Sequence, residues 1–292
     1  MIDRPVDTVS LERPPREAIG LHMADGASAD LVLYRPDGDE LAALLWVPAL
    51  GVAARHYEPL ALALADRGIA VAIHEWRGIG SSDRRAGRRS NWGYRELLTD
   101  DLPTSLRALR GAVPSVPLYV GGHSLGGQLA TVLAATTPMP LAGLALVGSG
   151  SPYWHCFKPW VGLALVAAPL LANVLGWLPG RRVGFGGNEA RGVIGDWSRT
   201  GRTGRYAGRG IDVDLESALR TQRAPVFALR LRDDWFGPEA SLAFLLDKMP
   251  EAPRRSEVID PEHLAGAAAD HFAWMKVPAE IARRLADWMQ PR

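Results

Sequence analysis

Short apolar runs alternate with longer amphipathic segments along most of the chain. Runs rich in Ala, Val, Leu and Ile, which are typical of strands buried on both faces, lie at residues 41–47, 69–76, 116–122, 141–148 and 225–231. Segments with helical character lie at residues 56–68, 94–111, 127–136, 238–249 and 279–289. Residues 18–40 predict two more strands joined by a turn at Asp25-Gly26, and residues 256–260 predict a last strand. This alternation predicts an α/β fold with a mostly parallel central sheet flanked by helices.

Two segments do not follow this alternation of strands and helices. Residues up to about 18 contain several prolines and predict an extended lead-in. Residues 151–212 do not alternate between strand and helix, and we interpret them as a helical cap inserted above the sheet. Residues 1–150 and 213–292 then form the core of one domain, which a chain of 292 residues with 47% apolar residues can fill.

A glycine-flanked serine lies where the strand at 116–122 meets the helix at 127–136. Gly122-His123-Ser124-Leu125-Gly126 fits the pattern G-x-S-x-G in the strand–turn–helix context that this motif requires. The turn is so tight that side chains two residues before and after the serine would collide, which explains both glycines. It exposes the Ser124 hydroxyl above the sheet edge, where the N–H groups of the next helix also point. We therefore predict that Ser124 is a nucleophile.

A serine hydroxyl needs a base, and the base needs an orienting carboxylate. Of the seven histidines, only His263 and His271 follow the last predicted strand; we favour His271, in the loop before the final helix, over His263. The strand at 225–231 is followed by two acids, Asp233 and Asp234. We choose Asp234 as the triad acid and keep Asp233 as the alternative. His123, which adjoins the serine, is read as a packing residue.

These residues and three further stretches resemble the α/β-hydrolase superfamily. "GHSLGG" is similar to its nucleophile turn, "RGIGSSD" (77–83) to a turn after the preceding parallel strand, and "VPALGVAARHYEPLALALADRG" (47–68) to its oxyanion loop and following helix. Within the superfamily the chain most resembles bacterial serine aminopeptidase-like hydrolases. "RGIGSSD" lacks the third glycine of a dinucleotide-binding loop, so we read it as a turn.

The resemblance implies the order Ser124, Asp234, His271 and an oxyanion hole made by two backbone N–H groups. Leu125 and Val52 would supply them, with Leu50 as the alternative to Val52. Many relatives have His-Gly in this loop, whereas this chain has Leu50-Gly51. The donor is a backbone group, so the function does not require the histidine side chain.

The predicted activity is hydrolysis of a carboxylic ester with an apolar acyl group through an acyl-enzyme; a thioester or amide is a possible variant. The alternatives are an acyltransferase that uses the same three residues and a non-catalytic binding protein that keeps the fold. We expect the apolar cap to pack on the core and Trp154 and Trp160 to contact the acyl group.

Residues 159–180 contain no charge and are about as long as a membrane-spanning helix. A single span there would separate Ser124 from Asp234 and His271, so we expect a cap rather than a span. Shallow contact with a membrane surface is the less favoured reading.

Composition excludes several other classes. The net charge of +1 argues against a nucleic-acid partner. No run of histidines, cysteines and acids has the spacing of metal ligands, and we expect neither metal nor other cofactor. Cys156 is the only cysteine, so stability cannot depend on an intrachain disulfide. With no apolar stretch at the N-terminus, we expect a cytoplasmic protein.

Overall fold

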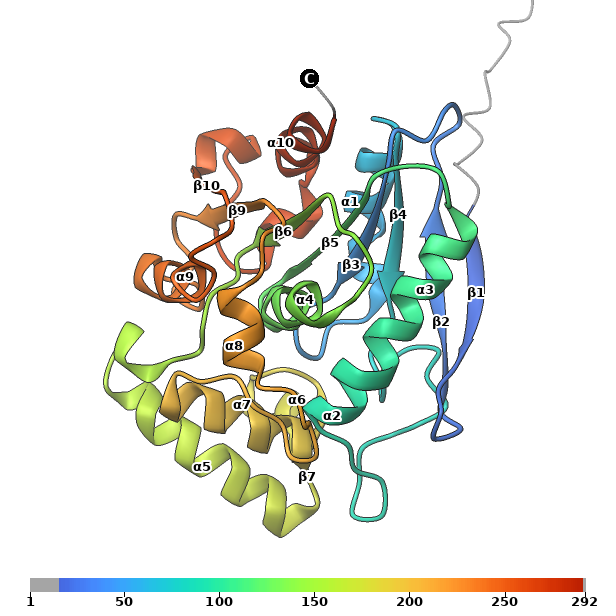
Figure 1. Cartoon of the computed structure of the whole chain (residues 1–292). Coiled ribbons are helices and arrows are strands. Elements are labelled where there is room, and N and C mark those ends of the chain that lie inside the picture. The colour runs from blue at the N-terminus through green and yellow to red at the C-terminus, as the bar shows by residue number, and fades with distance from the viewer. Residues whose placement is uncertain (1–15, 291–292) are drawn as a thin grey trace, which may run out of the picture.

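Eight strands form one central sheet in the computed structural model, which describes residues 16–290 (Figure 1). Their order is β1-β2-β4-β3-β5-β6-β9-β10. All neighbours from β4 to β10 are parallel, and β2 pairs antiparallel with β1 and β4. The strands are β1 (Arg16–His22), β2 (Ser28–Tyr34), β3 (Ala42–Val47), β4 (Ile69–His74), β5 (Leu118–His123), β6 (Gly143–Val147), β9 (Val226–Leu231) and β10 (Arg254–Ile259).

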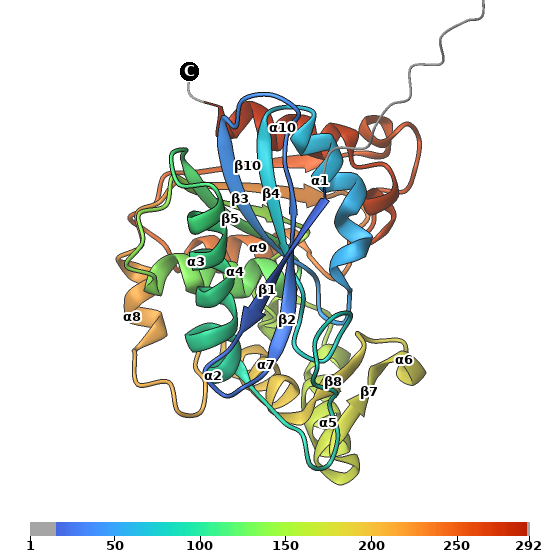
Figure 2. The ribbon, with the colours of Figure 1, turned by 90° about the vertical axis from the view of Figure 1, so that its right-hand side faces the viewer.

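Helices cover both faces of this sheet, and each face buries its own apolar cluster. Figure 2 shows α3 and α4 on one side of the sheet and α1 on the other. One layer consists of α2 (Tyr94–Glu96), α3 (Leu102–Ala112), α4 (Leu125–Thr136), α8 (Leu215–Arg220) and α9 (Glu239–Leu246). The opposite layer consists of α1 (Glu58–Ala65) and α10 (Ala279–Met289), which pack against each other. Strands β3, β4, β5 and β6 are buried along their whole length, as continuous apolar runs require.

The mostly parallel sheet and its flanking helices confirm the predicted fold class. The two N-terminal strands pair through the turn at Asp25-Gly26, as predicted. The helix expected over 94–111 is interrupted by a π-helical turn at Leu97–Asp101. This turn ends two residues before Pro103, which lacks the N–H that a regular helix would use. Most of the predicted N-terminal lead-in lies outside the described residues.

Residues 151–212, here called the cap segment, lie beyond the carboxyl ends of the parallel strands (Figures 1 and 2). Their elements are α5 (Trp160–Leu175), β7 (Trp177–Pro179), α6 (Gly180–Val183), β8 (Asn188–Ala190) and α7 (Arg191–Thr203). β7 and β8 form a separate antiparallel pair, and α5 packs on α7. The segment touches the oxyanion loop, because the backbone of Gly186 and Gly187 lies against Gly51.

The expectation that the apolar cap packs on the core is wrong for the outer face of α5. Leu165 and Ala172 are buried on the side that faces α7, whereas Leu163, Leu170 and Val174 are exposed. A helix that is apolar all round can bury only the side that meets a neighbour. Across residues 16–290, every helix is too short or too polar to cross a bilayer.

Candidate active site

The backbone of Ser124 is held in a conformation that few non-glycine residues adopt, with φ 55° and ψ −124°. The residue lies between the end of β5 at His123 and the start of α4 at Leu125. A Cβ atom on Gly122 would lie 2.6 Å from the Val47 carbonyl oxygen, and one on Gly126 would overlap the same oxygen. The two glycines therefore allow the sharp turn, as the sequence predicts.

His271 and Asp234 form a buried pair at the same edge of the sheet. Nδ1 of His271 lies 2.7 Å from Oδ2 of Asp234, and the Asp234 side chain is fully buried. The second carboxylate oxygen accepts from the N–H groups of Phe236 (2.8 Å) and Gly237 (3.1 Å). These N–H groups fix the orientation of the carboxylate, and its Oδ2 accepts from Nδ1–H of His271, which orients the imidazole.

The alternative acid and base lie elsewhere. Asp233 lies in the same turn after β9, but its side chain is exposed. His263 belongs to a short 3₁₀ turn, where its Nδ1 accepts from the Asp260 N–H at 2.9 Å. The structure thus brings Asp234 to His271 and leaves Asp233 and His263 outside the pair.

Hydrogen bonds hold the loop that carries His271 in place. The buried indole of Trp274 donates to the His271 carbonyl oxygen at 3.0 Å. Asp270 accepts from the N–H groups of Phe272 and Ala273, which closes the turn around the imidazole. The His271 ring lies beside the Ser124 turn, with its centroid 4.5 Å from that of His123.

His123 and Tyr57 connect this turn to the oxyanion loop. The Tyr57 hydroxyl accepts from the Ala49 N–H at 2.8 Å, so its own proton is directed to Nδ1 of His123, also at 2.8 Å. Burial, with a smaller effect of the nearby His271, holds the pKa of His123 well below its ordinary value, so the ring is neutral. Reading His123 as a packing residue missed this contact; Tyr57 is separated from it by 66 residues, and no local pattern links them.

The oxyanion loop follows β3. It differs from the sequence prediction in which of its backbone N–H groups is free to donate. The Val52 N–H donates to the Ala49 carbonyl oxygen at 3.1 Å, so it is not free for a substrate, and the prediction of Val52 as a donor conflicts with this turn. Within residues 16–290, the N–H groups of Leu50 and Leu125 have no acceptor. The Trp76 indole holds the loop by donating to the carbonyl oxygens of Pro48 (3.2 Å) and Ala49 (3.1 Å).

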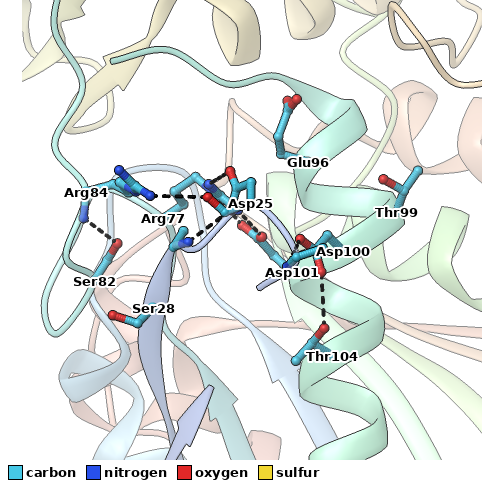
Figure 3. Close-up of polar contacts among 12 residues, drawn as sticks. Asp25, Ser28, Arg77, Ser82, Arg84, Glu96, Thr99, Asp100, Asp101 and Thr104 are labelled. Atoms are coloured by element: carbon cyan, nitrogen blue, oxygen red, sulfur yellow. Dashed lines mark hydrogen bonds and ion pairs between the residues drawn. The ribbon is translucent and has the colours of Figure 1, made fainter. Parts of the chain in front are cut away.

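Arg77 and Ser82 hold the "RGIGSSD" turn through an ion-pair network and hydrogen bonds (Figure 3). The buried Arg77 guanidinium bonds to Asp101 through Nε at 3.0 Å and to Asp25 through Nη1 at 2.6 Å. The Ser82 hydroxyl accepts from the N–H groups of Gly78 and Arg84. Arg77 therefore ties the turn after β4 to the π-helical turn at Leu97–Asp101 and to the hairpin turn at Asp25, which agrees with our interpretation of this motif as a structural turn.

The predicted acyl-contacting tryptophans are less enclosed than expected. Trp154 is partly buried, and Trp160 is half-exposed with its ring 5.7 Å from that of Trp235. A cavity of about 660 Å³ between α2 and α7 is lined by Trp92, five arginines and two acids, and not by Ser124 or His271. Among residues 16–290, His, Cys, Asp and Glu side chains do not gather in threes that could hold a metal ion.

A comparison with known protein families shows which family this chain matches. Residues 38–197, more than half of the chain, match the family model described as serine aminopeptidase, S33. The chain belongs to this family of the α/β-hydrolase superfamily. The matched region of this α/β-hydrolase contains Ser124, the oxyanion loop and most of the cap segment.

One curated relative matches part of this hydrolase, and two solved structures match nearly all of it. The human monoglyceride lipase is 27% identical over 124 residues, which is 42% of this chain and 40% of that protein, so the chain matches less than half of its length. A solved carboxyl esterase from Bacillus coagulans superposes with a TM-score of 0.63, 14% identity and coverage of 94% of this chain and 97% of that one. An esterase domain from Rhodothermus marinus gives a TM-score of 0.60 at 18% identity, with 94% and 97% covered. These two structures establish the fold, and the chain is a hydrolase by family.

Proposed function

We propose that this hydrolase cleaves carboxylic esters through an acyl-enzyme on Ser124. The observation that carries the proposal is the combination of the strained Ser124 turn with the buried His271–Asp234 pair beside it. Ser124 Oγ attacks the carbonyl carbon while Nε2 of His271 takes the hydroxyl proton, and Asp234 stabilises the resulting imidazolium. The tetrahedral intermediate collapses, the alcohol leaves with the proton from His271, and the acyl group stays on Ser124.

Water then completes the cycle. His271 removes a proton from water as it attacks the acyl carbonyl, and the second tetrahedral intermediate releases the carboxylic acid and restores the Ser124 hydroxyl. Both intermediates carry an oxyanion. We assign its donors to the N–H groups of Leu125 and Leu50, since the Val52 N–H is occupied within the loop. Leu125 is the first residue of α4, so the positive end of the helix dipole also favours the negative oxygen.

The acyl group is proposed to be apolar. The cap segment contributes an uncharged helix, α5, whose Trp160 packs against Trp235 of the loop after β9; Trp235 stacks on Phe236, which contacts His271. The names of the relatives, a monoglyceride lipase and two esterases, favour an ester over an amide. Trp154 and Trp160 stay our candidates for contact with the acyl chain.

A panel of p-nitrophenyl esters of increasing acyl length tests this proposal. Replacing Ser124→Ala or His271→Ala is expected to lower kcat by roughly 10⁴-fold or more. His263→Ala is the matched control, because that imidazole is bonded only within its own turn, and it is expected to keep the wild-type rate. Wild-type turnover by Ser124→Ala, or loss of turnover in His263→Ala alone, contradicts the assignment. A rate that is independent of acyl length contradicts the apolar acyl preference.

A further inference from the structure

The exposed side of α5 carries most of the large apolar side chains that the described part of the chain leaves in solvent. Six of them lie on this helix: Trp160, Leu163, Val166, Leu170, Leu171 and Val174. Leu163, Leu170 and Val174 are 75%, 61% and 71% exposed. A contiguous exposed apolar surface of this kind is typical of an interaction site.

The outward direction of this face follows from helix geometry. Leu165 and Ala172 point to α7, and positions 163, 170 and 174 share one stripe on the opposite side, because they are separated by seven and four residues. Figure 1 shows α5 on the outside of α7, at the end of the molecule far from α1 and α10. The stripe is therefore accessible to a broad surface along the full length of the helix.

The charged residues that flank α5 in the sequence are of one sign. Residues 157–188 contain Lys158 before the helix and Arg181 and Arg182 after it, and no acidic residue. Arg88 reaches the carbonyl oxygen of Val174 at the carboxyl end of the helix. An apolar stripe with cations at both ends matches the arrangement of acyl chains and anionic headgroups in a lipid surface.

The 660 Å³ cavity places further arginines beside α5. Asn173 of α5 borders it together with Arg191, Arg202 and Arg209. Within residues 16–290, these three arginines form no ion pair with a carboxylate, whereas Arg95 and Arg199, which also line the cavity, are paired with Glu96 and Asp196. Three unpaired guanidinium groups beside the helix are placed to meet phosphate groups at headgroup level.

We infer that the outer face of α5 docks this hydrolase on a membrane surface that contains anionic lipids, with the helix lying in the plane of the interface. The Trp160–Trp235 pair lies at one end of the helix, and tryptophan favours the boundary between acyl chains and headgroups.

The docked face leads to the candidate active site. The rings of Trp160 and Trp235 lie 5.7 Å apart, those of Trp235 and Phe236 lie 3.7 Å apart, and Phe236 is 5.0 Å from His271. This aromatic path would guide an acyl chain from the lipid surface toward Ser124. This last step rests on the proposed function, whereas the docking itself does not.

Flotation of the full chain with phosphatidylcholine vesicles, with and without phosphatidylglycerol, tests the docking. We expect binding to the anionic vesicles that weakens as salt is added. The double variant Leu163→Glu/Val174→Glu should lower the partition coefficient about tenfold or more. Arg181→Glu/Arg182→Glu should remove the preference for anionic vesicles. Leu41→Glu is the matched control, because Leu41 is also an exposed apolar residue but precedes β3 at the opposite end of the sheet, and it should bind as the wild type does.

Hydrolysis of a soluble short-chain ester is measured on the same preparations to separate the two proposals. Retained hydrolysis in all variants shows that they fold. Wild type that cleaves the ester but does not float with either vesicle overturns the docking and leaves the proposed function intact. Wild type that binds vesicles but does not cleave the ester supports the docking and contradicts the proposed function. A lipid-free dimer that Leu163→Glu/Val174→Glu dissociates would assign the face to a second copy of the chain and overturn the inference.

Discussion

Asp234 and His271 are 37 residues apart in the chain and are joined by a 2.7 Å contact between Oδ2 and Nδ1. Asp233, which precedes Asp234 in the chain, is also an aspartate. Within the turn that follows β9, the Asp234 side chain is buried and the Asp233 side chain is exposed. This difference makes the pair of aspartates a matched set for mutation.

Asp234→Asn is expected to lower kcat for ester hydrolysis by about 10⁴-fold, because an amide in this position no longer selects the tautomer and orientation of His271. Asp233→Asn should leave kcat within a factor of about two, since its side chain faces solvent. Steady-state kinetics on one p-nitrophenyl ester compares them. Equal losses in both variants, or a larger loss in Asp233→Asn, would refute the assignment of the acid.

Gly126, beside Ser124, and Gly195, in α7, should respond in opposite ways to replacement by alanine. Gly126→Ala places a Cβ on the carbonyl oxygens of Val47 and Pro48 and should destabilise the protein by about 3 kcal/mol or more. Gly195→Ala, in the middle of α7 with nothing within 4 Å of the new Cβ, should stabilise it by up to about 1 kcal/mol. Urea unfolding measures both. A stable Gly126→Ala protein would show that the turn has more room than the structure gives it.

Tyr57→Phe should affect both stability and rate. It leaves the Ala49 N–H and Nδ1 of His123 buried without their partner, at a cost of roughly 1–3 kcal/mol. Because Ala49 belongs to the oxyanion loop, kcat should fall more than KM rises. Tyr119→Phe is the control: it also removes a buried hydroxyl, one that donates to the Met289 carbonyl oxygen, but it lies far from the loop and should leave kcat unchanged. The account fails if the two variants change kcat equally.

Glu189 predicts a pH dependence of stability. Its side chain is buried in β8 and accepts from the Gly187 N–H at 2.7 Å, and burial raises the pKa of its carboxyl to about 7. An unfolded glutamate titrates near a pKa of 4.5, so the folded state binds this proton more tightly. The tighter binding of this proton therefore stabilises the folded state fully below pH 4.5, and this stabilisation is lost as the pH rises through 7.

Glu189→Gln keeps the acceptor and removes the titration. Relative to wild type, the variant should gain roughly 3 kcal/mol in unfolding free energy between pH 4.5 and pH 8. Chemical unfolding at a series of pH values measures the difference. Parallel pH profiles for the two proteins would mean that Glu189 is solvated or otherwise compensated in the fold.

The sequence predicts the frame of this molecule well because the frame depends on local signals. Fully apolar runs become the buried strands β3 to β6, and the G-x-S-x-G pattern becomes the strained turn at Ser124. Contacts between distant segments are not encoded in any local pattern. The Tyr57–His123 bond and the occupied Val52 N–H depend on how the loop after β3 folds against its neighbours, and the exposed stripe of α5 depends on which side of an all-apolar helix meets α7.

The identity of the nucleophile is tested most directly by mass spectrometry of the protein after reaction with a fluorophosphonate. We predict one adduct, on the peptide that contains Ser124, with ester hydrolysis lost in proportion to labelling and no adduct in Ser124→Ala. Labelling of a different serine, or full hydrolysis by protein that is completely labelled at Ser124, would contradict the account.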